Sequence, residues 1–214
     1  GYGYVGTGAF PDTVAFGGAS LTAETYDPEG AKAVLEAAGW MDSDGDGIRE
    51  KDGQKLVIRW LSYPSRQELP LLAESAQASL KDIGIQLDLN VTADHNSIVK
   101  DQSAWDIYVG ANVNSGLGDP TNFFSSFCQA ASTENRGSYH SDRLEELAAA
   151  LNGTFDSDER ARIAIEMQQT LLDDNAFVFC SFLRMSMISK ASVTGLTAHP
   201  CDFYELTAAL DINP

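Results

Sequence analysis

The chain has 214 residues, 31 acidic and 14 basic side chains, a formal net charge of −17 at pH 7 and a hydrophobic share of 43%. This length and composition predict a folded protein of one large or two small domains, and they exclude collagen, coiled-coil and disordered classes. The acidic surplus argues against nucleic acid as a partner. The longest apolar stretch, residues 176–183, is far shorter than the roughly 20 residues of a membrane-spanning helix.

The first expected helix follows a glycine-rich opening. Residues 1–25 show little periodicity and are expected to form a loop or a connection. Asp27 is a favourable N-cap, Pro28 suits the first helical position, and a glycine follows the last residue of the apolar repeat. An acidic turn, residues 42–53, then separates this helix from a strand expected at 55–63.

Two further helix–strand pairs are expected in the first half of the chain. A helix that begins near Pro70 should lead to a half-buried strand at 85–91, where hydrophobic and polar residues alternate. A short helix near 95–102 should lead to a third strand at 105–110. Because helices connect these strands, the strands are expected to be parallel, so the loops that follow them should share one edge of the sheet, where ligands bind. These loops are residues 63–67, 93–96 and 112–120.

The second half of the chain is expected to be mainly helical. Ser141 and Asp156 are favourable N-caps, and hydrophobic residues recur at helical spacing after each of them. Residues 176–183 have the composition of a strand, which is expected to continue toward Lys190, and a final strand is expected near 204–210. The whole pattern predicts an α/β fold with a mixed sheet that is parallel, β-α-β-α-β, in its first half and is flanked by helices.

The acidic turn is similar to the first half of a calcium-binding loop. Asp42, Asp44 and Asp46, followed by Gly47, match the spacing of oxygen ligands at the start of an EF-hand. The position that should hold a bidentate Glu is Gly53, and a strand is expected to follow in place of a helix. Two interpretations stay open: a turn that uses the conformational freedom of Asp and Gly, and a structural calcium site.

Residue types that perform covalent or metal catalysis do not occur in a recognisable arrangement. The three histidines, His95, His140 and His199, are not paired at zinc-ligand spacing, and no nucleophile motif is present. His95 lies at the expected ligand edge and His199 in a late loop, so both are candidate ligand contacts. A binding protein is therefore favoured over an enzyme, and a hydrolase or transferase with a nucleophile–base pair at the carboxyl edge stays open as a rival class.

The three cysteines, Cys128, Cys180 and Cys201, are too few for a disulfide scaffold and have no metal-binding spacing. They are expected to be small buried residues, and one disulfide with one free thiol stays open as an alternative. No residue pattern in the chain requires a cofactor.

Several segments, taken in order, resemble one known family. They begin with residues 26–40 (YDPEGAKAVLEAAGW) and 42–63 (DSDGDGIREKDGQKLVIRWLSY). They continue with residues 69–91, 104–109 and 118–127, the last of which reads GDPTNFFSSF. From about residue 24 to the end, this combination resembles the C-terminal lobe of the peptide/nickel family of ABC-importer solute-binding proteins.

The resemblance implies one lobe of a longer receptor. Residues 24–214 would form a C-terminal solute-binding lobe of the periplasmic-binding-protein type II fold, and residues 1–23 would connect it to a missing lobe. The parent protein would be extracytoplasmic, either periplasmic or a cell-surface lipoprotein, and peripheral to the membrane. It would close around a small solute or a metal chelate and deliver it to an ABC-importer permease.

The resemblance also implies where the solute binds. In this family the loop before the Asp-Pro pair lines the ligand cleft, and Tyr63 and Arg66 are candidate flanking contacts, with Arg66 suited to a carboxylate. Peptide receptors usually carry an Asp four residues before the proline, where this chain has Gly116. Nickel receptors often place an aromatic residue six or two residues before the proline, and this chain has none there. The candidate wall residues are Asn112, Asn114, Ser115, Gly116, Leu117, Gly118 and Asp119.

A nickel chelate is the favoured ligand, as a transported solute. The Gly-Asp-Pro ending and residues 173–207 look closer to the nickel branch of the family than to its peptide branch. His199 is carried over as a candidate nickel ligand, and His95 is a candidate from its position at the sheet edge. Two alternatives stay open: a dipeptide or oligopeptide receptor of the same family, and a sensor or interaction module without transport.

Overall fold

The computed structural model describes residues 3–114, 118–184, 186–198 and 206–213. The chain forms two compact units: residues 24–112 are unit 2, and residues 1–23 together with 113–214 are unit 1. The described part of 1–23 belongs to the same unit as the C-terminal half, and residues 24–214 are divided between the two units. That residues 24–214 form one solute-binding lobe stays a prediction. That residues 1–23 connect the chain to a further lobe stays a prediction.

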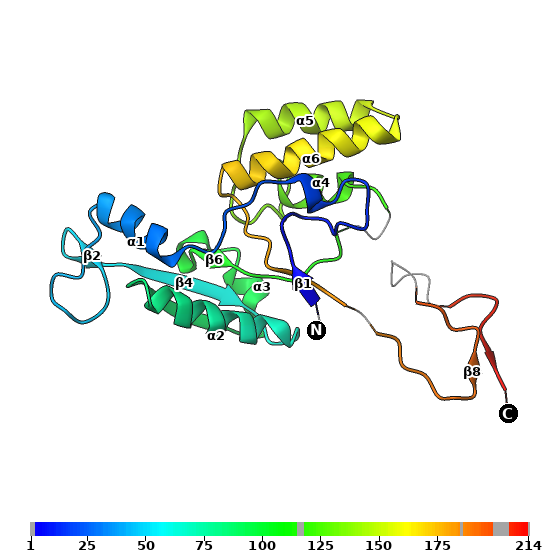
Figure 1. Cartoon of the computed structure of the whole chain (residues 1–214), viewed down its shortest axis with the longest axis horizontal. Coiled ribbons are helices and arrows are strands. Elements are labelled where there is room, and N and C mark those ends of the chain that lie inside the picture. The colour runs from blue at the N-terminus through cyan, green and yellow to red at the C-terminus, as the bar shows by residue number, and fades with distance from the viewer. Residues whose placement is uncertain (1–2, 115–117, 185, 199–205, 214) are drawn as a thin grey trace. The chain divides into compact units, whose positions relative to one another are not determined.

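Unit 2 is built on a three-stranded parallel sheet. Its strands are β4 (Val57–Ser62), β5 (Gln86–Val91) and β6 (Ile107–Tyr108), in the spatial order β5-β4-β6. Helix α2 (Glu68–Lys81) connects β4 to β5 and lies along β4 in Figure 1, and α3 (His95–Ile98) follows β5. The parallel β-α-β-α-β order expected from the sequence is therefore confirmed.

The two faces of this sheet bury different side chains of the same strand. Trp60 on β4 packs with Leu87 on β5 and Ala73 on α2. Leu61, the next residue, points to the opposite face and packs with Val99 and with Trp105, which follows the 3-10 helix η2 (Gln102–Ala104). Both faces of β4 are thus covered, which explains why apolar residues stand at neighbouring positions of this strand.

Helix α1 (Pro28–Ala37) begins as its sequence predicts. The Asp27 Oδ1 atom accepts a hydrogen bond from the Gly30 N–H at 2.9 Å, and Pro28 is the first helical residue. The chain leaves the helix through Gly39, whose φ of +86° is in the left-handed region that favours glycine.

A buried arginine joins the ends of the two longer helices of unit 2. The Arg49 guanidinium donates to Glu36 Oε1 at 3.0 Å, to the Trp40 C=O at 2.9 Å and to the Ile83 C=O at 2.8 Å. Its backbone N–H donates to the Gly84 C=O at 2.8 Å. Because Glu36 lies in α1 and Ile83 follows α2, this one side chain fixes the end of α1 against the end of α2.

A tight hairpin at the end of the acidic turn leads into β4. β2 (Glu50–Lys51) pairs with β3 (Gln54–Lys55) in antiparallel register, and the connecting Asp52 and Gly53 have φ values of +53° and +77°. The strand expected at 55–63 begins two residues later, at Val57, because Lys55 belongs to the hairpin.

The core of unit 1 lies among helices α4 (Thr121–Phe127), α5 (Asp142–Gly153) and α6 (Ser157–Asp173). Ser141 caps α5 and Asp156 caps α6, as the sequence predicts. Figure 1 shows α5 and α6 side by side. None of the described helices is both long and apolar enough to cross a membrane. The core side chains with almost no exposure are Phe124, Leu144, Leu151, Met167 and Leu171.

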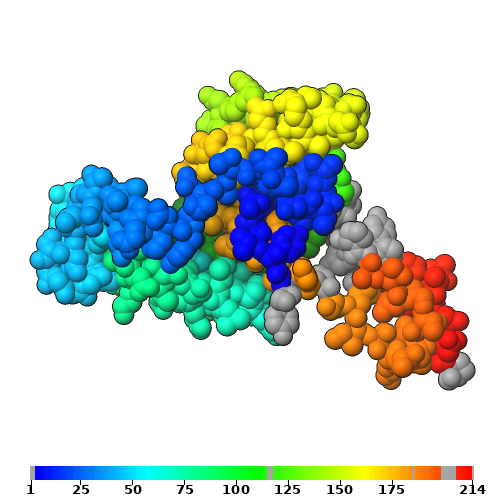
Figure 2. All heavy atoms as spheres, viewed as in Figure 1, coloured from blue at the N-terminus to red at the C-terminus, as the bar shows by residue number. Residues whose placement is uncertain are grey.

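The described part of residues 1–23 completes this core. β1 (Gly3–Val5) pairs antiparallel with β7 (Ser181–Leu183), and a 3-10 helix, η1 (Gly18–Ser20), follows later in the segment. Between them Ala9 and Phe10 are fully buried. Figure 2 shows the blue N-terminal residues packed against the yellow and orange end of α6.

The C-terminal strands are shorter than the sequence predicts. Among the described residues of the strand expected at 176–183 and onward to Lys190, Ser181–Leu183 forms a strand, which pairs with β1, and Phe177 and Phe179 pack against the core. In place of a strand near 204–210, β9 (Asp211–Ile212) pairs with β8 (Val193–Thr194), and residues 204 and 205 lie outside the described part. The sequence predicts one sheet with both parallel and antiparallel pairs of strands. Among the described residues, the parallel pairs and the antiparallel pairs lie in separate sheets.

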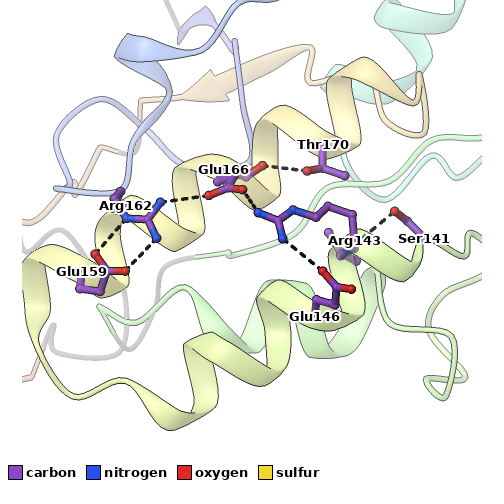
Figure 3. Close-up of polar contacts among 8 residues, drawn as sticks. Ser141, Arg143, Glu146, Glu159, Arg162, Glu166 and Thr170 are labelled. Atoms are coloured by element: carbon purple, nitrogen blue, oxygen red, sulfur yellow. Dashed lines mark hydrogen bonds and ion pairs between the residues drawn. The ribbon is translucent and has the colours of Figure 1, made fainter.

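Ion pairs connect the outer faces of α5 and α6, as Figure 3 shows. Arg143 on α5 pairs with Glu166 on α6, and with Glu146 at 3.2 Å. Arg162 pairs with Glu159 at 2.8 Å and with Glu166 at 3.0 Å. These side chains are exposed or half-buried, so each pair contributes little stability by itself, and the group keeps this face of the helices polar.

Candidate functional site

The residues at the carboxyl edge of the parallel sheet form an aromatic cluster. Tyr63 follows β4, His95 begins α3 after β5, and Tyr108 ends β6. The His95 ring stacks on Tyr63 with ring centroids 4.2 Å apart and on Tyr108 with centroids 6.0 Å apart. The structure therefore brings together two residues that the sequence singled out, Tyr63 and His95, at the edge where α/β proteins bind ligands.

Two tyrosine hydroxyl groups fix this cluster. The Tyr63 Oη atom accepts a hydrogen bond from the Ala111 N–H at 3.0 Å, and Tyr108 Oη lies 3.1 Å from His95 Nδ1. Tyr108 is a candidate that sequence reasoning missed. Its position in the sequence could have indicated it, because Tyr108 lies near the end of the third expected strand, as Tyr63 lies at the end of the first.

Arg66 and Asn112, two further candidates, also belong to unit 2. Arg66 lies in the turn before α2, where its C=O accepts the Leu69 N–H at 3.1 Å and its side chain is exposed. Asn112 is the exposed last residue of the unit. An exposed guanidinium in the loop after β4 suits a solute carboxylate.

The candidate wall loop continues into unit 1, where both of its described ends contact that unit. The Asn114 Nδ2 atom donates to the Ala9 C=O at 2.9 Å. Asp119 Oδ1 accepts the Thr121 N–H at 2.8 Å, and Asp119 Oδ2 accepts a hydrogen bond from Arg160 Nη2 at 2.5 Å. Gly118 is exposed, and the other candidates, Ser115, Gly116, Leu117 and His199, lie outside the described residues.

These contacts fix the charge of Asp119. Partial burial raises the pKa of this carboxyl, but hydrogen bonds from Thr121 and the ion pair with Arg160 outweigh burial, so the pKa lies below the ordinary value for Asp. Asp119 is therefore ionised at neutral pH and anchors the loop. A direct contact of Asp119 with the solute stays a prediction.

The acidic turn gathers a different set of carboxylates from the predicted one. Asp42, Asp44 and Glu50 each place an oxygen atom within 4.8 Å of the others. Asp46 lies outside this set and pairs with Lys55, which also pairs with Asp44 at 3.4 Å. The contact between Asp46 and Lys55 lowers the pKa of the Asp46 carboxyl and raises the pKa of the Lys55 amine. Glu50 is the ninth residue counted from Asp42, and position nine of an EF-hand loop also supplies a ligand, so the sequence pattern could have included it.

Hydrogen bonds within the turn support its interpretation as a local structure. Asp42 accepts the Gly45 N–H at 2.8 Å and the Gly47 N–H at 3.0 Å. Gly45 and Gly47 have φ values of +79° and +89°, which favour glycine. The turn interpretation and a calcium site remain compatible, because carboxylates can accept backbone hydrogen bonds and coordinate an ion with other lone pairs.

A calcium site at this turn stays a prediction with a direct test. About 5 mM Ca²⁺, which exceeds the roughly 1 mM dissociation constants of weak extracellular sites, is expected to raise the thermal unfolding midpoint of the wild type but not of Asp44→Asn. Asp158→Asn, which removes an exposed carboxylate from the first turn of α6, is the matched control and should keep the shift. An unchanged midpoint in the wild type would leave the turn a purely local structure.

The two described cysteines differ in burial. Cys128 is buried, Cys180 is exposed, and both are free thiols. Burial raises the pKa of the Cys128 thiol far above its ordinary value, so this thiol stays protonated and inert. The expectation of burial is wrong for Cys180, because its neighbours Phe177 and Phe179 pack inward and leave Cys180 on the outer side. Cys201 lies outside the described residues.

The fold defines the class of protein: an α/β structure of the type II periplasmic-binding-protein kind, with a parallel sheet flanked by helices. Residues 1–135 match the family described as bacterial extracellular solute-binding proteins, family 5, middle part. This match covers more than half of the 214 residues, and the chain belongs to that family.

The relatives found by sequence comparison are named as nickel-binding or peptide-binding proteins. The nickel-binding periplasmic protein of Escherichia coli is 28% identical over 198 residues, which cover 89% of this chain and 37% of that protein. Nickel-binding protein NikA of Staphylococcus aureus is 30% identical over 118 residues, which cover 53% of this chain and 24% of NikA. Oligopeptide-binding protein OppA of Mycobacterium bovis is 47% identical over 64 residues, 30% of this chain and 10% of OppA.

Solved structures share the fold. NikA from Staphylococcus aureus in complex with Ni(L-His)2 has a TM-score of 0.79 at 21% identity, covering 99% of this chain and 43% of NikA. The oligopeptide-binding protein AppA from Bacillus subtilis, in complex with a nonapeptide, has a TM-score of 0.80 at 20% identity, covering 94% of this chain and 41% of AppA. This chain spans less than half the length of these proteins.

Proposed function

We propose that this chain is part of the solute-binding component of an ABC importer, and that the solute is a nickel chelate. The observation that carries the proposal is His95 at the carboxyl edge of the sheet, where its ring stacks on Tyr63 and its Nδ1 atom lies 3.1 Å from Tyr108 Oη. Imidazole nitrogen is a preferred ligand of Ni²⁺. Membership of a solute-binding family and the nickel-binding names of two relatives support the same reading.

The chemistry of the chain suits a chelate better than a bare ion. Among the described residues, only the acidic turn groups three or more metal-ligating side chains, so His95 would supply one ligand and a small chelator the others. The Nδ1 atom of His95 lies 3.1 Å from Tyr108 Oη. The tyrosine hydroxyl would orient the ring and set its tautomer, and Arg66 would pair with a chelator carboxylate.

Capture would need no covalent step. The solute would stabilise a closed arrangement of the receptor because it contacts the closed state better than the open one. The receptor would act outside the cytoplasmic membrane, peripheral to it, and deliver the solute to a permease. The names of the relatives are those of binding proteins, which supports a role without catalysis.

A peptide receptor is the second candidate. It is favoured by the 47% identity to OppA over 64 residues. Gly116 speaks against the family's usual capture of a peptide α-ammonium by an Asp at that position, because burying an ammonium without a partner is costly. A peptide would therefore have to be held mainly through its backbone and carboxylate.

Calorimetry on the full-length protein separates the two candidates. Nickel with L-histidine is expected to bind saturably, and a mixed pool of di- and tripeptides is not. His95→Ala should weaken nickel–histidine binding at least about tenfold, because one inner ligand and one stacking surface are removed. His199→Ala tests the other candidate histidine in the same way.

His140→Ala is the matched control, since His140 is an exposed histidine that pairs with Asp142 in unit 1. It should leave the affinity unchanged. Heat from the peptide pool alone would replace the nickel proposal with the peptide receptor. Retention of the cognate permease on the immobilised protein would separate an importer component from a sensor or interaction module.

A further inference from the structure

The strand order of the parallel sheet in unit 2 reverses at β4. The chain runs from β4 to β5 on one side and then to β6 on the other side of β4, so the order in space is β5-β4-β6. In open α/β sheets, ligands bind at the carboxyl ends of the strands, at the point where the strand order reverses. Here that point lies between the ends of β4 and β6, which are followed by Tyr63 and Val109.

Two consecutive side chains at the end of β4 reach across this point. The paired part of β6 ends at Tyr108. Ser62 Oγ then donates to the Val109 C=O at 3.1 Å. Tyr63 Oη accepts the Ala111 N–H at 3.0 Å and donates to the Ala111 C=O at 3.4 Å. Side chains from the end of β4 thus hold the chain that follows β6.

The ring of Tyr63 contacts the chain that follows the other neighbouring strand, β5. It stacks on the imidazole of His95, with ring centroids 4.2 Å apart and 27° between the ring planes. His95 is the first residue of α3, which comes after β5. One half-buried side chain therefore connects all three strand ends of the sheet, because its hydroxyl binds Ala111 and its ring packs on His95.

We propose that Tyr63 is the residue that positions His95 for the solute. The inference rests on the proposed function, because it takes His95 as the ligand contact. The hydroxyl fixes the tyrosine ring across the point where the strand order reverses, and the ring fixes the imidazole that stacks on it. Tyr63 does this without touching the solute. Because the imidazole is ordered before the solute arrives, less entropy is lost on binding.

The two contacts of Tyr63 can be removed one at a time. Tyr63→Phe keeps the ring and loses both hydrogen bonds with Ala111. Tyr63→Leu also loses the ring, and with it the stacking on His95. If the ring positions His95 and the hydroxyl only holds the ring, the effect on the solute should be smaller in Tyr63→Phe than in Tyr63→Leu.

Two measurements on the full-length protein without solute test the two contacts. Hydrogen–deuterium exchange of the peptide covering residues 107–112 is expected to be faster in Tyr63→Phe than in the wild type, because the Ala111 N–H has lost its acceptor. The ring-proton NMR signals of His95 are assigned by their loss in His95→Ala. They should stay nearly in place in Tyr63→Phe and move in Tyr63→Leu, because the stacked ring no longer shields them.

Binding then shows whether Tyr63 acts through His95. Nickel with L-histidine, or the di- and tripeptide pool if that is the ligand, should bind to Tyr63→Leu about three- to tenfold more weakly than to the wild type. In a His95→Ala background, Tyr63→Leu should cause almost no further loss, since no imidazole is left to position. Losses that add up in the double variant would mean that Tyr63 acts independently of His95, which overturns the proposal.

Tyr26→Leu is the matched control, because Tyr26 is a tyrosine of the same unit that is 80% exposed. It should leave the exchange of 107–112, the His95 signals and the affinity as in the wild type, and effects equal to those of Tyr63→Leu would overturn the proposal. If Tyr63→Leu does not fold, Tyr63→Phe keeps the shape of the ring and carries the exchange and binding comparisons.

The proposal and the proposed function can fail separately. His95 signals that do not move in Tyr63→Leu overturn the positioning role, whichever solute binds. Wild-type exchange of 107–112 in Tyr63→Phe overturns the part given to the hydroxyl. If the wild-type protein binds neither probe, the proposed function fails, and the NMR and exchange results still decide whether Tyr63 orders this edge of the sheet.

Discussion

Replacing Gln168 with leucine is expected to lower the free energy of unfolding of unit 1 by about 2–4 kcal/mol. Gln168 is fully buried on α6, where it accepts the Ala9 N–H at 2.9 Å and donates to the Phe16 C=O at 2.8 Å. Leucine fills a similar volume but forms no hydrogen bond. Two buried backbone groups of the N-terminal segment would then have no partner, and each such group costs about 1–3 kcal/mol.

Gln169→Leu is the matched control for this variant. Gln169 is the next residue of α6 and also binds the N-terminal segment, through the Thr22 N–H at 2.9 Å and the Thr22 C=O at 3.0 Å. These bonds are exposed, so water can replace them, and the expected loss is below about 1 kcal/mol. Native-state hydrogen exchange of α6 in increasing urea measures both losses. Equal losses in the two variants would contradict the role given to burial.

Replacing Arg49 with methionine is expected to destabilise unit 2 by about 2–3 kcal/mol. The variant leaves the C=O groups of Trp40 and Ile83 without their donor. The Arg49 side chain is 11% exposed and that of Glu36 is 52% exposed, so water can solvate the carboxylate after the change. Most of the loss should therefore come from the two carbonyls and from the end of α1 separating from the end of α2.

Arg59→Met provides the comparison. Arg59 forms a two-point contact with Asp106, at 2.9 Å and 2.6 Å, but its side chain is 45% exposed. Exposed ion pairs contribute at most about 1 kcal/mol, so this variant should lose clearly less stability than Arg49→Met. Hydrogen exchange of β4 and α2 reports the stability of unit 2 alone. A loss in Arg59→Met as large as that in Arg49→Met would show that burial is not what makes Arg49 important.

Local sequence signals predicted most of unit 2 because its structure depends on near neighbours. The cap at Asp27 and the alternation over 85–91 each depend on residues within a few positions, and both are present in the structure. The edge position of Tyr63 and His95 followed from the order of strands and helices alone. Tyr108 was not expected at the edge, because the third strand was expected to continue to residue 110, whereas β6 ends at Tyr108.

The parts that the sequence could not predict depend on distant partners. β7 pairs with β1, which lies at the other end of the chain, and nothing near residue 181 reveals this partner. The acidic turn shows the same effect over a shorter range. Which of its carboxylates come together depends on the hairpin that brings Lys55 to Asp46 and Glu50 to Asp42 and Asp44.

The bond between Ala9 and Gln168 joins residues 159 positions apart, and this has a consequence for the order of folding. During synthesis, which starts at the N-terminal end, residues 24–112 are complete before α6 has been made. Unit 2 can therefore fold while the N-terminal segment still lacks Gln168, its partner on α6. Closing so long a loop is slow compared with forming the local contacts of unit 2. Until the helices of unit 1 have been made, Phe10 and Phe16 lack the side chains that bury them, and exposed apolar side chains of this kind are where a chaperone would act.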